Sequence, residues 1–92
     1  TLALQVTGRG GLPASGVTAV VLNVTATDAT QGGFVTAYPA GSPRPNASSL
    51  NFTAGDTVPN LVVVPVGSGG VIYLYNRTGT VNLVADVAGW FG

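Results

Sequence analysis

The strongest constraint on the fold is a two-residue alternation of apolar side chains in short segments bounded by glycine and proline. Within residues 17–27, the even positions from 20 to 26 are apolar, while Asn23, Thr25 and Thr27 occupy odd positions. Successive side chains of a strand point to opposite faces, so this segment directs one face to a core and the other outward. No stretch carries a sustained apolar period of 3.6 residues, so the pattern predicts strands and no helix.

Seven segments of this kind recur at a spacing of about ten residues. We expect strands over residues 2–7, 17–27, 34–38, 49–53, 58–66, 71–75 and 80–88. The connections at 28–33 and 76–79 have the length and composition of hairpin turns. The pattern predicts an all-β fold, an antiparallel β-sandwich of about seven strands formed by residues 1–92 as a single domain. A small β-barrel is the alternative architecture.

The segment 58–66 departs from the alternation, because its apolar side chains fall on both faces. Strands that are apolar on both faces are typical of positions buried on both sides. We therefore expect this strand to be central in its sheet or covered on both faces. Pro59 and Pro65 place its ends near an edge or a bulge.

The polar residues exclude most catalytic chemistry. The chain has no His, Cys, Lys or Glu, and its net charge is zero. A serine nucleophile then has no ordinary base, and neither a thiolate metal site nor a disulfide framework can form. We expect a protein that is not an enzyme, with no catalytic residue, no metal site and no cofactor.

The same inventory argues against two classes of partner. There is no basic cluster, which nucleic-acid binding requires. The longest apolar run, residues 61–66, is far shorter than the roughly 20 residues of a membrane helix. We expect neither nucleic-acid binding nor membrane insertion.

Asp86 is the charged residue whose position most needs an explanation, because it lies inside an apolar strand segment. A buried carboxylate is costly without a partner, so we expect an ion pair, with Arg44 favoured. Several backbone and hydroxyl donors are the alternative. Asp28 and Asp56 lie in turn segments, where capping of the backbone is the expected role.

Aromatic and amide side chains are the remaining candidates for ligand binding. Aromatic faces pack against the C–H surfaces of sugars, while amides hydrogen-bond the hydroxyl groups. The alternative is that the rings serve packing and the tyrosine hydroxyls reach water. The candidate ligand-binding residues are Tyr38, Asn60, Tyr73, Tyr75, Asn76 and Trp90.

Four ordered motifs are spread along the chain: VTAVVLNVT (17–25), PRPNASSLNF (43–52), TVPNLV (57–62) and ADVAGWF (85–91). In these motifs the chain resembles a β-rich module that occurs, often in tandem, in large secreted and wall-associated proteins of actinobacteria. The resemblance implies a non-catalytic module that is secreted or on the bacterial cell surface, as one unit of a repeat array. Members of that family carry a further segment before the equivalent of Leu2. Either the chain is trimmed before this point, or a first strand is missing and its position at the sheet edge is open.

Two functions follow as hypotheses. The first is binding of polysaccharide or cell-wall glycan through an aromatic and asparagine surface. The second is structural, with copies or adjacent repeats associating through uncharged faces and the open edge. Low charge favours the second, because few like charges keep copies apart and the strand edges lack lysine.

Overall fold

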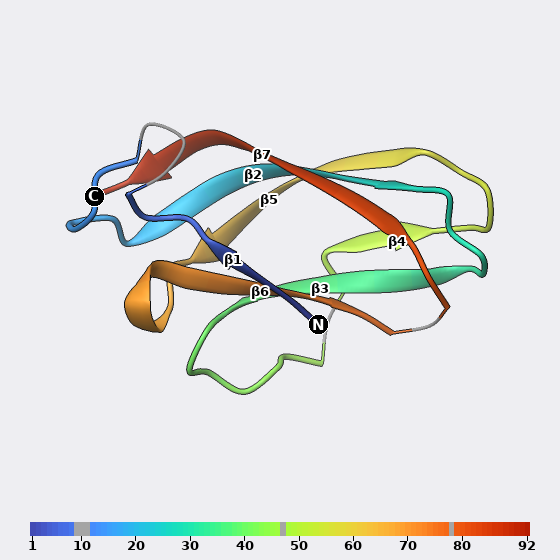
Figure 1. Cartoon of the computed structure of the whole chain (residues 1–92), viewed down its shortest axis with the longest axis horizontal. Coiled ribbons are helices and arrows are strands. Elements are labelled where there is room, and N and C mark those ends of the chain that lie inside the picture. The colour runs from blue at the N-terminus through green and yellow to red at the C-terminus, as the bar shows by residue number, and fades with distance from the viewer. Residues whose placement is uncertain (9–11, 47, 78) are drawn as a thin grey trace.

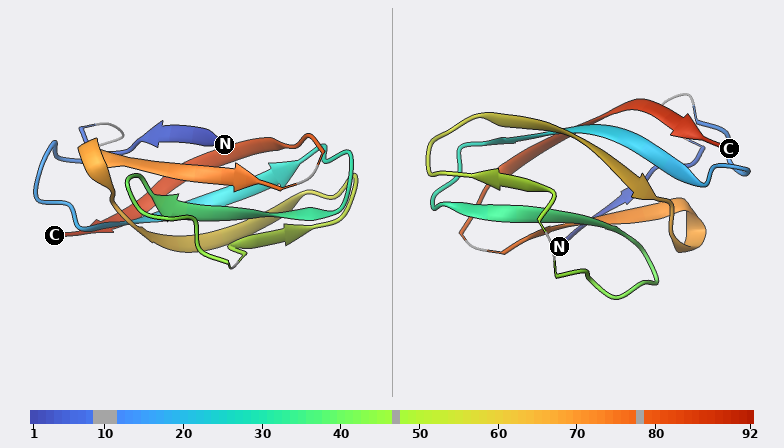
Figure 2. Two further views of the ribbon diagram at one scale, coloured as in Figure 1. Left: turned by 90° about the horizontal axis from the view of Figure 1, so that it is seen from below. Right: turned by 180° about the vertical axis from the view of Figure 1, so that it is seen from behind.

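The computed structural model describes residues 1–8, 12–46, 48–77 and 79–92, and its strands form two antiparallel sheets packed face to face (Figure 1). The four-stranded sheet has the order β1 (Leu2–Gln5), β6 (Val71–Asn76), β3 (Gly33–Pro39) and β4 (Leu50–Phe52). The three-stranded sheet has the order β5 (Val58–Pro65), β2 (Ala19–Thr27) and β7 (Asn82–Phe91). A single 3₁₀ turn, η1 (Ser68–Gly70), precedes β6. The predicted β-sandwich of seven strands is confirmed, and the two layers are separate in Figure 2.

The core lies between the sheets and is built by the alternating positions that the sequence marks. β2 runs through the middle of its sheet, paired with β5 on one side and β7 on the other. Its even positions are almost fully buried, and they pack against inward residues of the facing sheet. The largest fully buried apolar side chains are Val20, Leu22, Val24, Val35, Val64, Ile72 and Leu74.

The connections differ from the expected hairpins. Residues 28–32 join β2 to β3, and residues 77–81 join β6 to β7, so each crosses from one sheet to the other. Thr78 lies outside the described residues. The two connections bind each other, since the Thr30 amide donates to the Thr80 carbonyl at 3.0 Å. Turn residues specify a reversal of the chain, but they do not specify that the two strands pair.

β5 is an edge strand, so the expectation of a central or doubly covered strand is wrong. Among the described strands it pairs with β2 alone. Leu61 and Val63 point to the outer face and are each 61% exposed. The neighbouring inward position, Val64, is buried. Pro59 and Pro65 fit an edge, because proline has no amide hydrogen for a further ladder.

β7 extends beyond the predicted end at residue 88 and reaches Phe91. Its register against β2 shifts between Val21 and Leu22, which lie opposite Gly89 and Val87. The extra residue is a β-bulge, and bulges occur preferentially at sheet edges. The strand thus continues through Gly89 to Phe91.

Leu22 lies in the core and Leu61 on the outer face, so replacing each with alanine should lower the free energy of unfolding by different amounts. Leu22→Ala removes a side chain that is 1% exposed and should lower the free energy of unfolding by about 2–5 kcal/mol. Leu61→Ala, on the outer face, should lower it by about 1 kcal/mol or less. Urea denaturation of both variants measures the difference. Equal losses would contradict the placement of the core.

Candidate functional site

The outer face of the four-stranded sheet brings the tyrosines together. Tyr38 of β3 lies opposite Tyr73 of β6, and Thr36 lies opposite Tyr75. These positions alternate with core residues such as Leu74, so their side chains point away from the core. The Tyr38 and Tyr73 rings meet edge to face, with centroids 5.4 Å apart and planes at 62°. Three of the predicted ligand-binding residues therefore share one face.

The connection between β3 and β4 lies over part of this face. Its Arg44 guanidinium carbon is 3.9 Å from the centroid of the Tyr75 ring, a cation–π contact. Its end is fixed on β3, since the Ala37 amide donates to Ser49 Oγ at 3.0 Å. Thr36 is only 1% exposed, although it points outward. The covered part of the face is thus a packed structure of loop, arginine and sheet.

A second arginine joins the first. Arg77 follows β6, and its guanidinium carbon lies 5.6 Å from the centroid of the Phe34 ring. Both arginines line one pocket of about 280 Å³, and none of its described lining residues is acidic. The pocket is lined by Phe34, Thr36, Arg44, Pro45, Asn46, Tyr75 and Arg77. We name this the arginine pocket. Sequence analysis missed Arg77 and Phe34, because only the pairing of β3 with β6 brings them to Tyr75.

Asp86 lies on the three-stranded sheet, whereas Arg44 lies in the connection over the other sheet, so the predicted ion pair does not form. Asp86 is exposed, and it lies opposite Asn23 on the outer face of the three-stranded sheet. Arg44 is over Tyr75 on the outer face of the other sheet. The expectation that Asp86 is buried is wrong because an apolar strand does not guarantee cover on both faces. Its carboxylate faces solvent and requires no partner there.

The three other predicted ligand-binding residues are not part of the tyrosine face. Asn60 on β5 donates a side-chain hydrogen bond to the Ser49 carbonyl and so links the two sheets. Asn76 donates to the Gly79 carbonyl at 3.1 Å, within the turn after β6. Trp90 is 45% exposed, but it belongs to β7 of the other sheet. The two amides therefore have structural partners, and the indole is on a separate layer.

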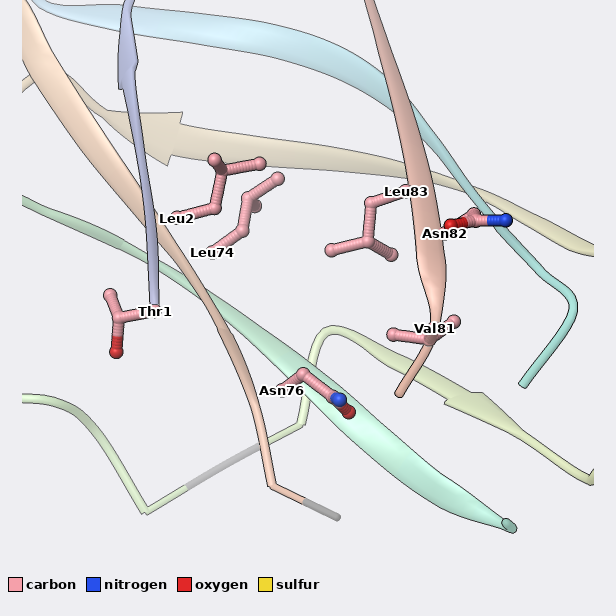
Figure 3. Close-up of a pocket in the computed structure, with 7 residues that line it drawn as sticks. All are labelled: Thr1, Leu2, Leu74, Asn76, Val81, Asn82 and Leu83. Carbon is pink, nitrogen blue, oxygen red and sulfur yellow. The ribbon is translucent and has the colours of Figure 1, made fainter. Parts of the chain in front are cut away.

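A second pocket, of about 380 Å³, opens between β6 and β7 beside the start of β1 (Figure 3). Leu74 and Leu83 extend from the two strands into the space between them. Among the described residues, Oδ1 of Asn76 is buried with no hydrogen-bond partner. The wall is formed by Thr1, Leu2, Leu74, Asn76, Val81, Asn82 and Leu83. This pocket lies between the sheets and is separate from the tyrosine face.

The remaining aspartates lie in connections between strands. Asp28 accepts a hydrogen bond from the Asn82 amide at 3.1 Å, and its backbone φ of 56° is in the left-handed region that aspartate tolerates. Asp56 accepts one from the Thr53 hydroxyl. Among the described residues no three side chains of His, Cys, Asp or Glu are grouped so as to hold a metal ion. Within that part of the chain, no helix has the length and apolar character to cross a membrane.

Comparisons with known proteins do not guide the assignment of the site. No protein-family model, curated protein or solved structure matches this chain.

The placement of the polar residues predicts how stability responds to their loss. Asp86→Ala should change the free energy of unfolding by no more than about 0.5 kcal/mol, because the carboxylate is exposed. Asn60→Ala should lower it by about 1 kcal/mol through loss of the bond between the sheets. Urea denaturation compares the two. A loss of about 3 kcal/mol for Asp86→Ala would instead indicate a buried ion pair.

Proposed function

We propose that this chain is a non-catalytic accessory module that binds carbohydrate, a polysaccharide or a cell-wall glycan, outside the bacterial cell. The observation that carries the proposal is the gathering of Tyr38, Tyr73 and Tyr75 on the outer face of one sheet. The location, secreted or on the cell surface, is supported by the resemblance to modules of secreted and wall-associated proteins.

Tyr38 and Tyr73 form the stacking platform of the proposed site. Both rings are half-buried and touch each other, so their orientations are held by the sheet and by the neighbouring ring. Ala3 of β1 lies opposite Tyr73 on its other side, and this small exposed residue leaves the ring open there. Tyrosine offers a large rigid surface at low cost in conformational entropy, which suits the weakly polar face of a sugar ring.

Tyr75 has a different role in the proposed site. Its ring carries the guanidinium of Arg44 and is therefore not a free stacking surface. It positions the arginine beside the platform, where N–H groups can donate to sugar hydroxyls. The polar part of sugar recognition then comes from Arg44 and Arg77, in place of the asparagines that the sequence suggested.

The position of the aspartates supports binding without hydrolysis. Glycoside hydrolysis needs two carboxyl groups flanking the scissile bond. Asp28 and Asp56 bind neighbouring side chains in connections, and Asp86 is on the other sheet. No described residue of the arginine pocket is acidic.

The tyrosine platform is tested by Tyr38→Ala and Tyr73→Ala in binding to insoluble polysaccharides such as chitin, cellulose and peptidoglycan. Each substitution should weaken retention about 3- to 10-fold, the size expected for losing one aromatic contact. Trp90→Ala is the matched control, since it removes a ring of the other sheet and should leave retention unchanged. A wild-type chain that binds no polysaccharide, or binding lost only in Trp90→Ala, would refute the proposal.

Self-association is a second candidate function, favoured by the outer face of the three-stranded sheet. Leu61 and Val63 are each 61% exposed there, and Val84 is 51% exposed. β5 is an edge with no charged residue along Val58–Pro65, whereas edge strands of monomeric proteins are commonly guarded by charge. A second copy can pair the segment between Pro59 and Pro65 of its own β5 with the same segment here about a two-fold axis, which makes one continuous apolar face.

This second function predicts that the average molar mass measured by light scattering rises with protein concentration. The double variant Leu61→Lys/Val63→Lys should stay monomeric. Charge on the edge strand should prevent pairing without disturbing the core, because both positions point outward. Thr25→Lys on the same face is the control for a charge placed on a non-edge strand. A wild-type chain that remains monomeric at every concentration would exclude this function.

A further inference from the structure

We propose that the glycan bound by this chain is acidic, and that Arg44 and Arg77 receive a carboxylate or phosphate group carried by one of its sugars. This inference rests on the proposed function and specifies its ligand class. Both arginines line the arginine pocket, beside the tyrosine platform on the same outer face.

The distribution of charge is the first argument. The chain has only three basic and three acidic residues, and its net charge is zero. Two of the basic residues nevertheless line one pocket, whose described lining includes no acid. Like charges in one pocket repel each other, and a bound anion relieves that repulsion. The aspartates lie elsewhere, so the pocket is a local positive site on a molecule whose net charge is zero.

The orientation of the guanidinium groups is the second argument. Each is held by an aromatic ring, Arg44 by Tyr75 and Arg77 by Phe34. A guanidinium that stacks on a ring, as the 3.9 Å separation at Arg44 indicates, keeps its N–H edges free to donate. Within the described part of the chain, neither guanidinium donates a hydrogen bond to a protein acceptor. The N–H groups of both guanidiniums are therefore available to donate hydrogen bonds to a ligand.

The backbone around Arg44 strengthens this argument. Arg44 stands between Pro43 and Pro45, which have fixed φ angles, and a residue before proline is confined to extended conformations. The loop therefore loses less entropy when Arg44 is held in place. Guanidinium forks match the oxygens of a carboxylate or phosphate with two parallel hydrogen bonds, which an ammonium group cannot do.

The arrangement along β6 is the third argument. Tyr73 and Tyr75 are two residues apart on one face of the strand, a separation of about 7 Å. A sugar stacked on Tyr38 and Tyr73 therefore has the arginine pocket beside it along the strand. An acidic substituent on that sugar, or on the next one, can reach both arginines.

The experiment measures affinity by isothermal titration calorimetry with two matched pairs of ligands. One pair is an oligogalacturonate and its methyl ester, which share a backbone and differ in the charged carboxylate. The other is a phosphomannan and the same mannan after dephosphorylation. We expect the acid form of at least one pair to bind about tenfold or more tightly than its neutral form. Which pair responds identifies the anion.

Substitutions of the arginines connect that preference to the pocket. Arg44→Gln/Arg77→Gln should abolish the preference for the acid form. Both forms should bind more weakly, because hydrogen bonds to sugar hydroxyls are lost as well, but the ratio of the two affinities should fall to about one. Arg44→Lys/Arg77→Lys keeps the charge but removes the forks, so it should retain only part of the preference. Asp86→Asn changes the net charge from the opposite sheet and should leave the preference intact.

The outcomes separate this inference from the proposed function. If acid and neutral forms bind alike, or the glutamine variant keeps the preference, the inference is overturned while glycan binding stands. If the chain binds neither these ligands nor the insoluble polysaccharides, both fail. If the glutamine variant does not fold, the inference is still tested by comparing the affinities of the wild-type chain for the acid and neutral forms. Its preference must also weaken with salt, as the screening length shortens from about 30 Å at 0.01 M to about 8 Å at 0.15 M.

Discussion

The alternation of buried and outward side chains along β2 is the constraint on which the rest of the structure depends. β2 is the only described strand paired on both sides within the three-stranded sheet, and its even positions form the centre of the core. A register slip of one residue would turn those side chains to solvent and expose the core. Once β2 is fixed, β5 and β7 are fixed by pairing with it, and the facing sheet must present its own apolar positions inward.

Fixing the inner faces also fixes two outer faces of different character. The outer face of the four-stranded sheet carries tyrosines, an arginine-bearing loop and the arginine pocket. The outer face of the three-stranded sheet carries Leu61, Val63 and Val84 among Asn and Thr residues. The tyrosines are half-buried, whereas the apolar side chains of the other face are mostly exposed. The two proposed functions therefore belong to opposite faces and need not exclude each other.

The sequence predicted the strands well because strand signals are local. Alternation and bounding glycines or prolines place all seven within a few residues of their observed ends. Which strand belongs to which sheet was not predictable in this way. A short turn can join two paired strands of one sheet, or two strands of different sheets, equally well. The same limit explains Asp86, whose strand was recognised but whose outer face was wrongly assumed to be covered. Tyr73 and Tyr75 share a face by alternation alone, but Tyr38 joins them only through the pairing of β3 with β6.

The central claim is that the outer face of the four-stranded sheet is the surface that meets the glycan. The most direct test is a nitrogen-15 NMR titration with an oligosaccharide that the chain retains, following the backbone amides of both sheets. The account predicts shifts concentrated at residues 34–38, 43–46 and 73–77, with small changes across β2, β5 and β7. Shifts confined to the outer face of the three-stranded sheet would contradict it.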